Sequence, residues 1–142
     1  MKNLIFICHG NTFRSQIAEA IFNHNPKEGW QACSYGTLIN EEEIQGDNIL
    51  KISPQMNIVI NEMKKNGMDI SNNYSKRLFP ESLIGAEKVI VMSEVKYDPD
   101  WLSDKEYERW EIPNPEIINP KILEEVIVLL TKKIEELKDR LS

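Results

Sequence analysis

The sequence lacks most of the features that mark secreted, membrane or nucleic-acid-binding proteins. It has only two cysteines, Cys8 and Cys33, which cannot form a disulfide framework. No apolar run approaches the ~18 residues of a membrane span, and no signal-peptide cleavage site follows Met1–Cys8. The net charge of −6 argues against a general nucleic-acid binder. These absences predict a cytoplasmic protein without membrane or nucleic-acid partners.

What is present fits one globular domain. The chain has 142 residues, of which 41% are hydrophobic, enough for a single core. We find no internal repeats, low-complexity segments or domain linker. The sequence therefore predicts one domain over residues 1–142, which we expect to be a monomer or a weak dimer.

Strand-like and helix-like patterns alternate along the chain. Apolar segments predict strands at Lys2–Cys8, Trp30–Gly36, Glu87–Ser93 and Trp110–Pro113. Between and after them we predict helices with N-caps at Ser15 and Ser53, a polar loop over Thr37–Ser53, and a long helix from Pro120. Such alternation indicates an α/β fold with a parallel sheet and helices on both faces. Ligands bind beyond the carboxyl ends of such strands, which is where Cys8, Ser93–Lys96 and Asn114 should lie.

The segment between the first strand and the first helix carries the candidate chemistry. Gly10 and Asn11 suit the unusual backbone angles of a tight turn. A loop of this kind directs successive N–H groups into one hollow, and the helix N-terminus adds a partial positive charge. Arg14 can hold two oxygens of an oxyanion in a planar fork. We therefore expect phosphate or a phosphorylated substrate to bind residues Cys8, His9, Gly10, Asn11, Thr12, Phe13 and Arg14.

Cys8 is the expected nucleophile of this site. N–H donors, an arginine and a helix start all favour the thiolate, which is the reactive form of cysteine. Attack on bound phosphorus would form a covalent cysteinyl-phosphate, and the Ser15 hydroxyl could donate a hydrogen bond to the sulfur. We expect His9 to contribute local charge or packing alone, and Asn11 to hold the loop through its side chain.

Several stretches together resemble one family. "LIFICHGNTFRSQIAEA", at residues 4–20, resembles the opening of the low-molecular-weight protein tyrosine phosphatases and of the thioredoxin-coupled arsenate reductases that share their fold. "CSYGT", "GMDISNNYSKRL", "AEKVIVMSE" and "WEIPNPE" match later segments in order. The resemblance implies a three-layer sandwich with a four-stranded parallel sheet in the order 2-1-3-4. It also implies a site without metal or other cofactor, with catalytic roles for Cys8, Arg14 and Ser15.

Three positions depart from the family pattern. The family's general acid is an aspartate in an Asp-Pro pair, whereas this chain has Asn114 before Pro115. An amide can donate a hydrogen bond to a leaving oxygen but cannot protonate it, so turnover of poor leaving groups should suffer. Phe13 stands where phosphatases of the family often carry a second cysteine. Glu116, Ile117 and Ile118 stand where aromatic residues hold the phosphotyrosine ring.

Another carboxyl group could serve as the acid instead. Asp98, in the loop after the third predicted strand, is the main alternative, and Glu116 is a second. Each of these two residues also fits an ordinary surface turn with no catalytic role.

Three functions follow from these residues. The first is a phosphomonoester hydrolase acting through cysteinyl-phosphate, weakened by Asn114. The second is an arsenate reductase that uses an external thiol, because "VMSEVKYDPDWL" lacks the cysteines of the thioredoxin-coupled mechanism. The third is a module that binds a phosphorylated ligand without turning it over.

Overall fold

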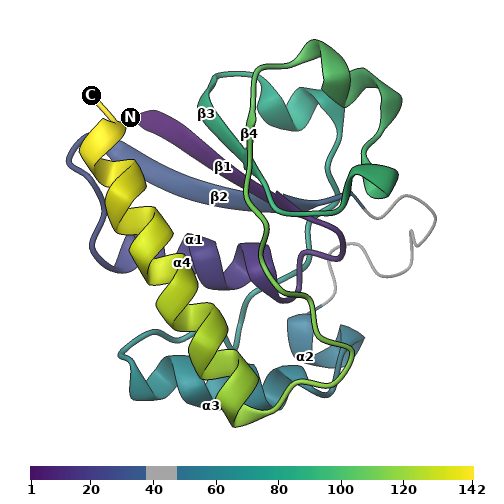
Figure 1. The fold of residues 1–142 in the computed structure, drawn as a ribbon, viewed down its shortest axis with the longest axis vertical. Helices are drawn as coiled ribbons and strands as arrows, with labels where there is room; N and C mark the ends of the chain where they lie inside the picture. Colours follow the sequence, from purple (N-terminus) through teal and green to yellow (C-terminus); the bar gives the residue numbers. More distant parts are fainter. Residues whose placement is uncertain (38–47) are drawn as a thin grey trace.

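A parallel sheet forms the centre of the molecule. The computed structural model describes residues 1–37 and 48–142, so most of the predicted polar loop lies outside the described residues. In the described part, the strands β1 (Lys2–Cys8), β2 (Trp30–Gly36), β3 (Ala86–Val91) and β4 (Glu108–Arg109) are all parallel. Their order is β2-β1-β3-β4 (Figure 1), which confirms the order that the resemblance implied.

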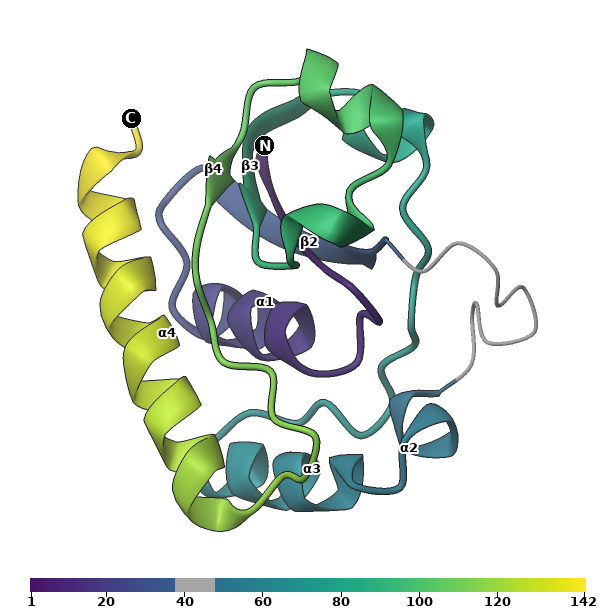
Figure 2. The same cartoon turned by 45° about the vertical axis from the view of Figure 1, so that its right-hand side comes forward.

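Helices cover the two faces of the sheet unequally. Long helices lie on one face: α1 (Arg14–His24), α3 (Met56–Lys65) and α4 (Pro120–Arg140), with α1 between the sheet and α3 (Figure 2). Side chains such as Phe6, Ile17 and Leu130 form the main core there. The other face is covered through the short 3₁₀ helices η1 (Pro80–Leu83) and η3 (Asp100–Asp104), with η2 (Val95–Tyr97) nearby. None of the described helices is long and apolar enough to cross a membrane.

Both predicted serine caps were wrong. Helix α1 begins at Arg14, and Ser15 lies inside it, where its hydroxyl serves tertiary contacts instead of the helix end. Ser53 ends a short helix, α2 (Ile49–Ile52), and its backbone N–H donates to Ile49. Helix α3 starts only at Met56. In each case the local pattern identified the helix but misplaced its first residue.

The fourth strand lies earlier in the chain than we predicted. Pairing with β3 is confined to Glu108–Arg109, followed by one further bond of 2.9 Å from the Trp110 N–H to the Val91 carbonyl. The apolar residues Trp110 and Ile112 are buried nevertheless, and the Trp110 ring packs 6.0 Å from that of Phe6. The apolar pattern therefore indicated burial in the core and not strand pairing.

Glu108 joins β4 to the end of α4. Arg140 donates from Nη1 and Nη2 to the two carboxylate oxygens at 2.8 and 2.9 Å, and Trp110 Nε1 donates at 2.6 Å. The bonds from Arg140 are the main reason that the pKa of Glu108 is lowered from 4.5 to about 2.

Removing Arg140 should therefore have a pH-dependent effect on stability. At neutral pH we expect Arg140→Ala to lower the free energy of unfolding by about 0.5–1 kcal/mol, since the pair is partly exposed. The contribution is complete above pH 4.5 and is lost as the pH falls toward about 2, because Glu108 becomes protonated. Urea denaturation at neutral pH and near pH 2 tests this, with Lys132→Ala on the same helix as control. An equal loss of unfolding free energy at neutral and at low pH would contradict the prediction.

Candidate active site

The loop from Cys8 to Arg14 surrounds a small cavity at the carboxyl end of β1. Its volume is about 170 Å³, and we call it the small cavity. The thiol-bearing residue, Cys8, is 2% exposed. The lining residues are Cys8, His9, Gly10, Thr12, Phe13, Arg14 and Asn114. The structure thus places Asn114, from the chain after β4, on the same wall as the predicted loop residues.

Asn11 fixes the shape of this loop. It has a φ of +52°, the left-handed region, whereas Gly10 does not adopt a positive φ. The buried Asn11 side chain uses its whole hydrogen-bonding capacity. Nδ2 donates to the hydroxyls of Ser15 (2.8 Å) and Ser34 (3.0 Å), and Oδ1 accepts from the backbone N–H of Lys76 (2.7 Å) and from Gln16 Nε2 (3.2 Å). The expectation that Asn11 holds the loop agrees with these contacts.

The same network orients the hydroxyl of Ser15. Ser15 Oγ lies 2.9 Å from Cys8 Sγ, and both residues are buried. Because Ser15 Oγ accepts a bond from Asn11, its own O–H is free to donate to the sulfur. A donor in this position stabilises negative charge on the sulfur.

The loop also offers unpaired backbone donors. Within the described residues, no backbone N–H group from His9 to Phe13 donates a hydrogen bond to the protein. Gly36, at the end of β2, allows the loop to approach closely, since a Cβ there would stand 2.7 Å from the His9 carbonyl oxygen and 2.9 Å from the Asn11 nitrogen. Successive free N–H groups around a hollow are a common arrangement for binding anions.

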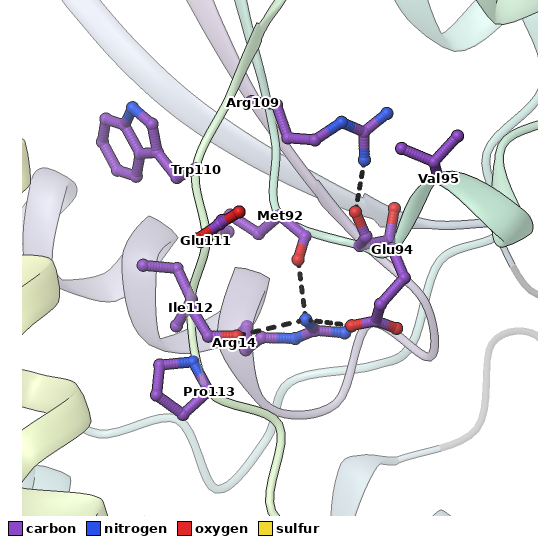
Figure 3. Close-up of a pocket in the computed structure, with 10 residues that line it drawn as sticks. Arg14, Met92, Glu94, Val95, Arg109, Trp110, Glu111, Ile112 and Pro113 are labelled. Carbon is purple, nitrogen blue, oxygen red and sulfur yellow. Dashed lines mark hydrogen bonds and ion pairs between the residues drawn. The ribbon is translucent and has the colours of Figure 1, made fainter.

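Arg14 is anchored on the side away from the loop. Its Nη1 donates to the Met92 carbonyl at 2.6 Å and to Glu94 Oε1 at 2.8 Å, with a longer contact of 3.4 Å to the Ile112 carbonyl (Figure 3). Among the described residues, no hydrogen bond reaches its Nε or Nη2. One end of the guanidinium is therefore held by protein, and the other edge remains available to a ligand.

Glu94 also borders a second, larger cavity. This large cavity, of about 590 Å³, lies beside Arg14, which lines both cavities. Partial burial acts to raise the pKa of Glu94, but the hydrogen bond and charge of Arg14 outweigh it, so the pKa lies below its ordinary value. Glu94 thus stays ionised at neutral pH and partly balances the charge of Arg14.

His9 is held in a defined orientation at the small cavity. Its ring stacks on that of Tyr97, with centroids 3.9 Å apart and planes inclined by 19°. Its Nδ1 lies 3.4 Å from the hydroxyl of Thr37. Burial is the main reason that the pKa of His9 lies below 6.5; Glu94 opposes this shift, while Arg14 and Lys96 add to it.

The two alternative acids lie away from the small cavity wall. The carboxylate of Asp98 pairs with Arg109, which also donates to the Ser93 carbonyl. Glu116 is exposed, and its backbone carbonyl accepts a bond from Gln55 Nε2. Neither residue lines the cavity that contains Cys8, so we do not assign either of them the role of proton donor.

Cys33 faces the opposite side of the sheet from Cys8. Cys8 belongs to the core beneath α1, whereas Cys33 packs against the core on the 3₁₀-helix face. Both cysteines are free thiols. Cys33 is therefore badly placed to form a disulfide with Cys8.

Sequence reasoning missed three contacts that shape the site. Glu94 bonds to Arg14, Gly36 admits the loop, and the ring of Tyr97 stacks on that of His9. The position of Ser93–Lys96 at the end of a predicted strand was the one available signal for Glu94. No local pattern pairs it with an arginine 80 residues earlier in the chain.

Comparison with known proteins finds a family whose sequence model matches nearly the whole chain. Residues 3–142 match the family model "Low molecular weight phosphotyrosine protein phosphatase". A low molecular weight protein tyrosine phosphatase from T. tengcongensis is similar in structure, with a TM-score of 0.78 and 25% identity over 99% of this chain and 100% of that one.

Two further solved structures share the fold. An arsenate reductase in the phosphate binding state has a TM-score of 0.74 and 22% identity, with 100% of both chains covered. The YwlE arginine phosphatase from Geobacillus stearothermophilus has a TM-score of 0.71 and 18% identity, over 99% of this chain and 92% of that one. At these identities the similarity establishes the fold alone.

The contacts of Asn11 predict a large effect of its removal. We expect Asn11→Ala to lower the free energy of unfolding by about 2–4 kcal/mol, because buried partners lose their bonds and alanine disfavours a positive φ. Chemical denaturation measures the loss. Asn72→Ala, at an exposed asparagine, is the matched control. A change of similar size in the two variants would show that the network contributes little.

Proposed function

Because this chain belongs to the low molecular weight phosphotyrosine protein phosphatase family, we propose that it hydrolyses phosphomonoesters through a cysteinyl-phosphate intermediate. One observation carries the proposal: Cys8 lines the small cavity, its Sγ lies 2.9 Å from the Ser15 hydroxyl, and Arg14 from the same loop lines the cavity as well. A nucleophile, a donor to it and a cation thus share one site.

Phosphate binding rests on the donors around the small cavity. The N–H groups of the loop and the Nε–Nη2 edge of Arg14, which have no partner within residues 1–37 and 48–142, match the oxygens of a tetrahedral dianion. The arsenate reductase of the same fold was solved in a phosphate binding state, which supports an oxyanion as ligand. Because Arg14 is already anchored through Nη1, it would lose little freedom on binding.

The reaction then follows in two steps. The Cys8 thiolate attacks phosphorus, forming an S–P bond while the P–O bond to the leaving group breaks. Arg14 and the loop N–H groups stabilise the charge on the equatorial oxygens. Water next attacks the phosphorus, the S–P bond breaks, and the Ser15 hydroxyl stabilises the departing thiolate.

Asn114 limits which substrates this site can turn over quickly. It lines the small cavity at the position where the family pattern has an aspartic acid. Its amide has no titrating proton to give to a leaving oxygen. If no other group supplies that proton, the site should prefer phosphate esters whose leaving groups depart readily as anions.

Two other functions remain as alternatives. Asn114 favours the binding module, which would hold a phosphorylated ligand without hydrolysing it. Arsenate reduction would need an external thiol, since Cys33 packs on the opposite face of the sheet.

Replacing the nucleophile tests the hydrolase. Wild-type protein should release phosphate from p-nitrophenyl phosphate, and Cys8→Ser should abolish this release because serine is far less nucleophilic at neutral pH. Cys33→Ser is the matched control and should retain the wild-type rate. If the wild-type protein releases no more phosphate than Cys8→Ser, the hydrolase proposal is wrong.

Restoring the carboxyl group tests the role of position 114. A positioned proton donor contributes about 10²–10⁴-fold, so Asn114→Asp should raise kcat for phenyl phosphate by up to that factor wherever no other group on the small cavity protonates the leaving oxygen. The rate for p-nitrophenyl phosphate should rise much less, since its leaving group needs less protonation. Steady-state kinetics on both substrates measure this. An unchanged ratio of the two rates would show either that the leaving group lies away from residue 114 or that another residue already protonates it.

A further inference from the structure

We propose that His9 donates the proton to the leaving-group oxygen, the role that Asn114 cannot perform. This inference rests on the proposed hydrolase function and assigns one of its catalytic residues. It replaces our expectation from sequence that His9 contributes local charge or packing alone.

The composition of the small cavity leaves His9 as the available acid. Among the described residues, the titratable or charged side chains on its wall are Cys8, His9 and Arg14. Cys8 is needed as the thiolate nucleophile, and a guanidinium does not release its proton in proteins. The imidazolium of His9 is the remaining group that can give a proton near neutral pH.

The contacts of His9 suit a proton donor. Stacking on Tyr97, with ring centroids 3.9 Å apart, fixes the plane of the imidazole. Nδ1 is next to the Thr37 hydroxyl at 3.4 Å, while Nε2 has no hydrogen-bond partner among the described residues. One nitrogen is thus positioned by protein and the other is free to face a ligand.

The charges around His9 determine when it carries its proton. Glu94 favours the imidazolium, whereas burial, Arg14 and Lys96 disfavour it, and the ring of Tyr97 stacks against the imidazole. The Cys8 thiolate and a bound phosphate dianion would add negative charge close by, which favours the imidazolium further. The proton is therefore best retained when substrate occupies the cavity.

The proposed step balances in protons and charge. As Cys8 attacks and the P–O bond breaks, the Nε2 proton of the imidazolium moves to the leaving oxygen, which departs as an alcohol or phenol. The neutral imidazole then accepts a proton from the water that attacks cysteinyl-phosphate. Inorganic phosphate leaves, and thiolate and imidazolium are restored.

The test compares two leaving groups in two histidine variants. His9→Gln should lower kcat for phenyl phosphate by about 10²–10⁴-fold and kcat for p-nitrophenyl phosphate much less. Wild-type kcat for phenyl phosphate should fall as the pH rises through the pKa of His9, and this decline should be absent from His9→Gln. His24→Gln is the matched control, because His24 is the chain's other histidine and lies exposed at the end of α1.

Each outcome bears on a different claim. If the wild-type rate exceeds that of Cys8→Ser but His9→Gln keeps the wild-type preference and pH profile, the role of His9 is overturned and the hydrolase stands. If the wild-type protein does not exceed Cys8→Ser on either ester, both proposals fail. Recovery of the phenyl phosphate rate in the double variant His9→Gln, Asn114→Asp would show that His9→Gln is folded and lacks only an acid. An equal loss on both esters in His9→Gln would overturn the assignment, because a missing acid should affect phenyl phosphate far more than p-nitrophenyl phosphate.

Discussion

The buried amide of Asn11 is the constraint on which the site depends. A loop that leaves its backbone N–H groups unpaired gains no internal hydrogen bonds to hold its shape. Asn11, a residue of the loop, supplies that rigidity through contacts outside it. Its side chain bonds to Ser15 and Gln16 of α1 and to Ser34 of β2. The left-handed backbone at this one residue then allows strand to turn into helix within a few residues.

The second constraint is the buried charge of Arg14. A buried guanidinium without partners would be strongly destabilising. Here Nη1 meets Met92 and Ile112 carbonyls and the Glu94 carboxylate, so the charge is compensated before any ligand binds. Glu94 is itself partly exposed, with 44% of its side chain accessible. The arrangement keeps a cation on the cavity that Cys8 also lines, while the protein contacts of Nη1 limit the energetic cost of burying its charge.

Sequence predicted the elements whose signals are local, and missed those set by distant contacts. The apolar runs located β1 and β2, and the resemblance gave the strand order and the position of Asn114. The cap at Ser15 failed because a hydroxyl that suits a helix end also suits the bonds it makes with Cys8 and Asn11, and the cap at Ser53 failed because this residue ends the preceding short helix. The partnership of Arg14 with Glu94 and the stacking of His9 on Tyr97 join segments far apart in the chain, so no spacing rule could reveal them.

The close approach at Gly36 means that the sheet, not the loop, sets how deep the sulfur lies. A single methyl group at this residue would clash with the backbone of His9 and Asn11 and push it away from β2. The loop could not yield freely, since its far side is tied to α1. One added carbon, at a residue that does not line the small cavity, would therefore displace the loop and, in the hydrolase that we propose, the nucleophile that it carries.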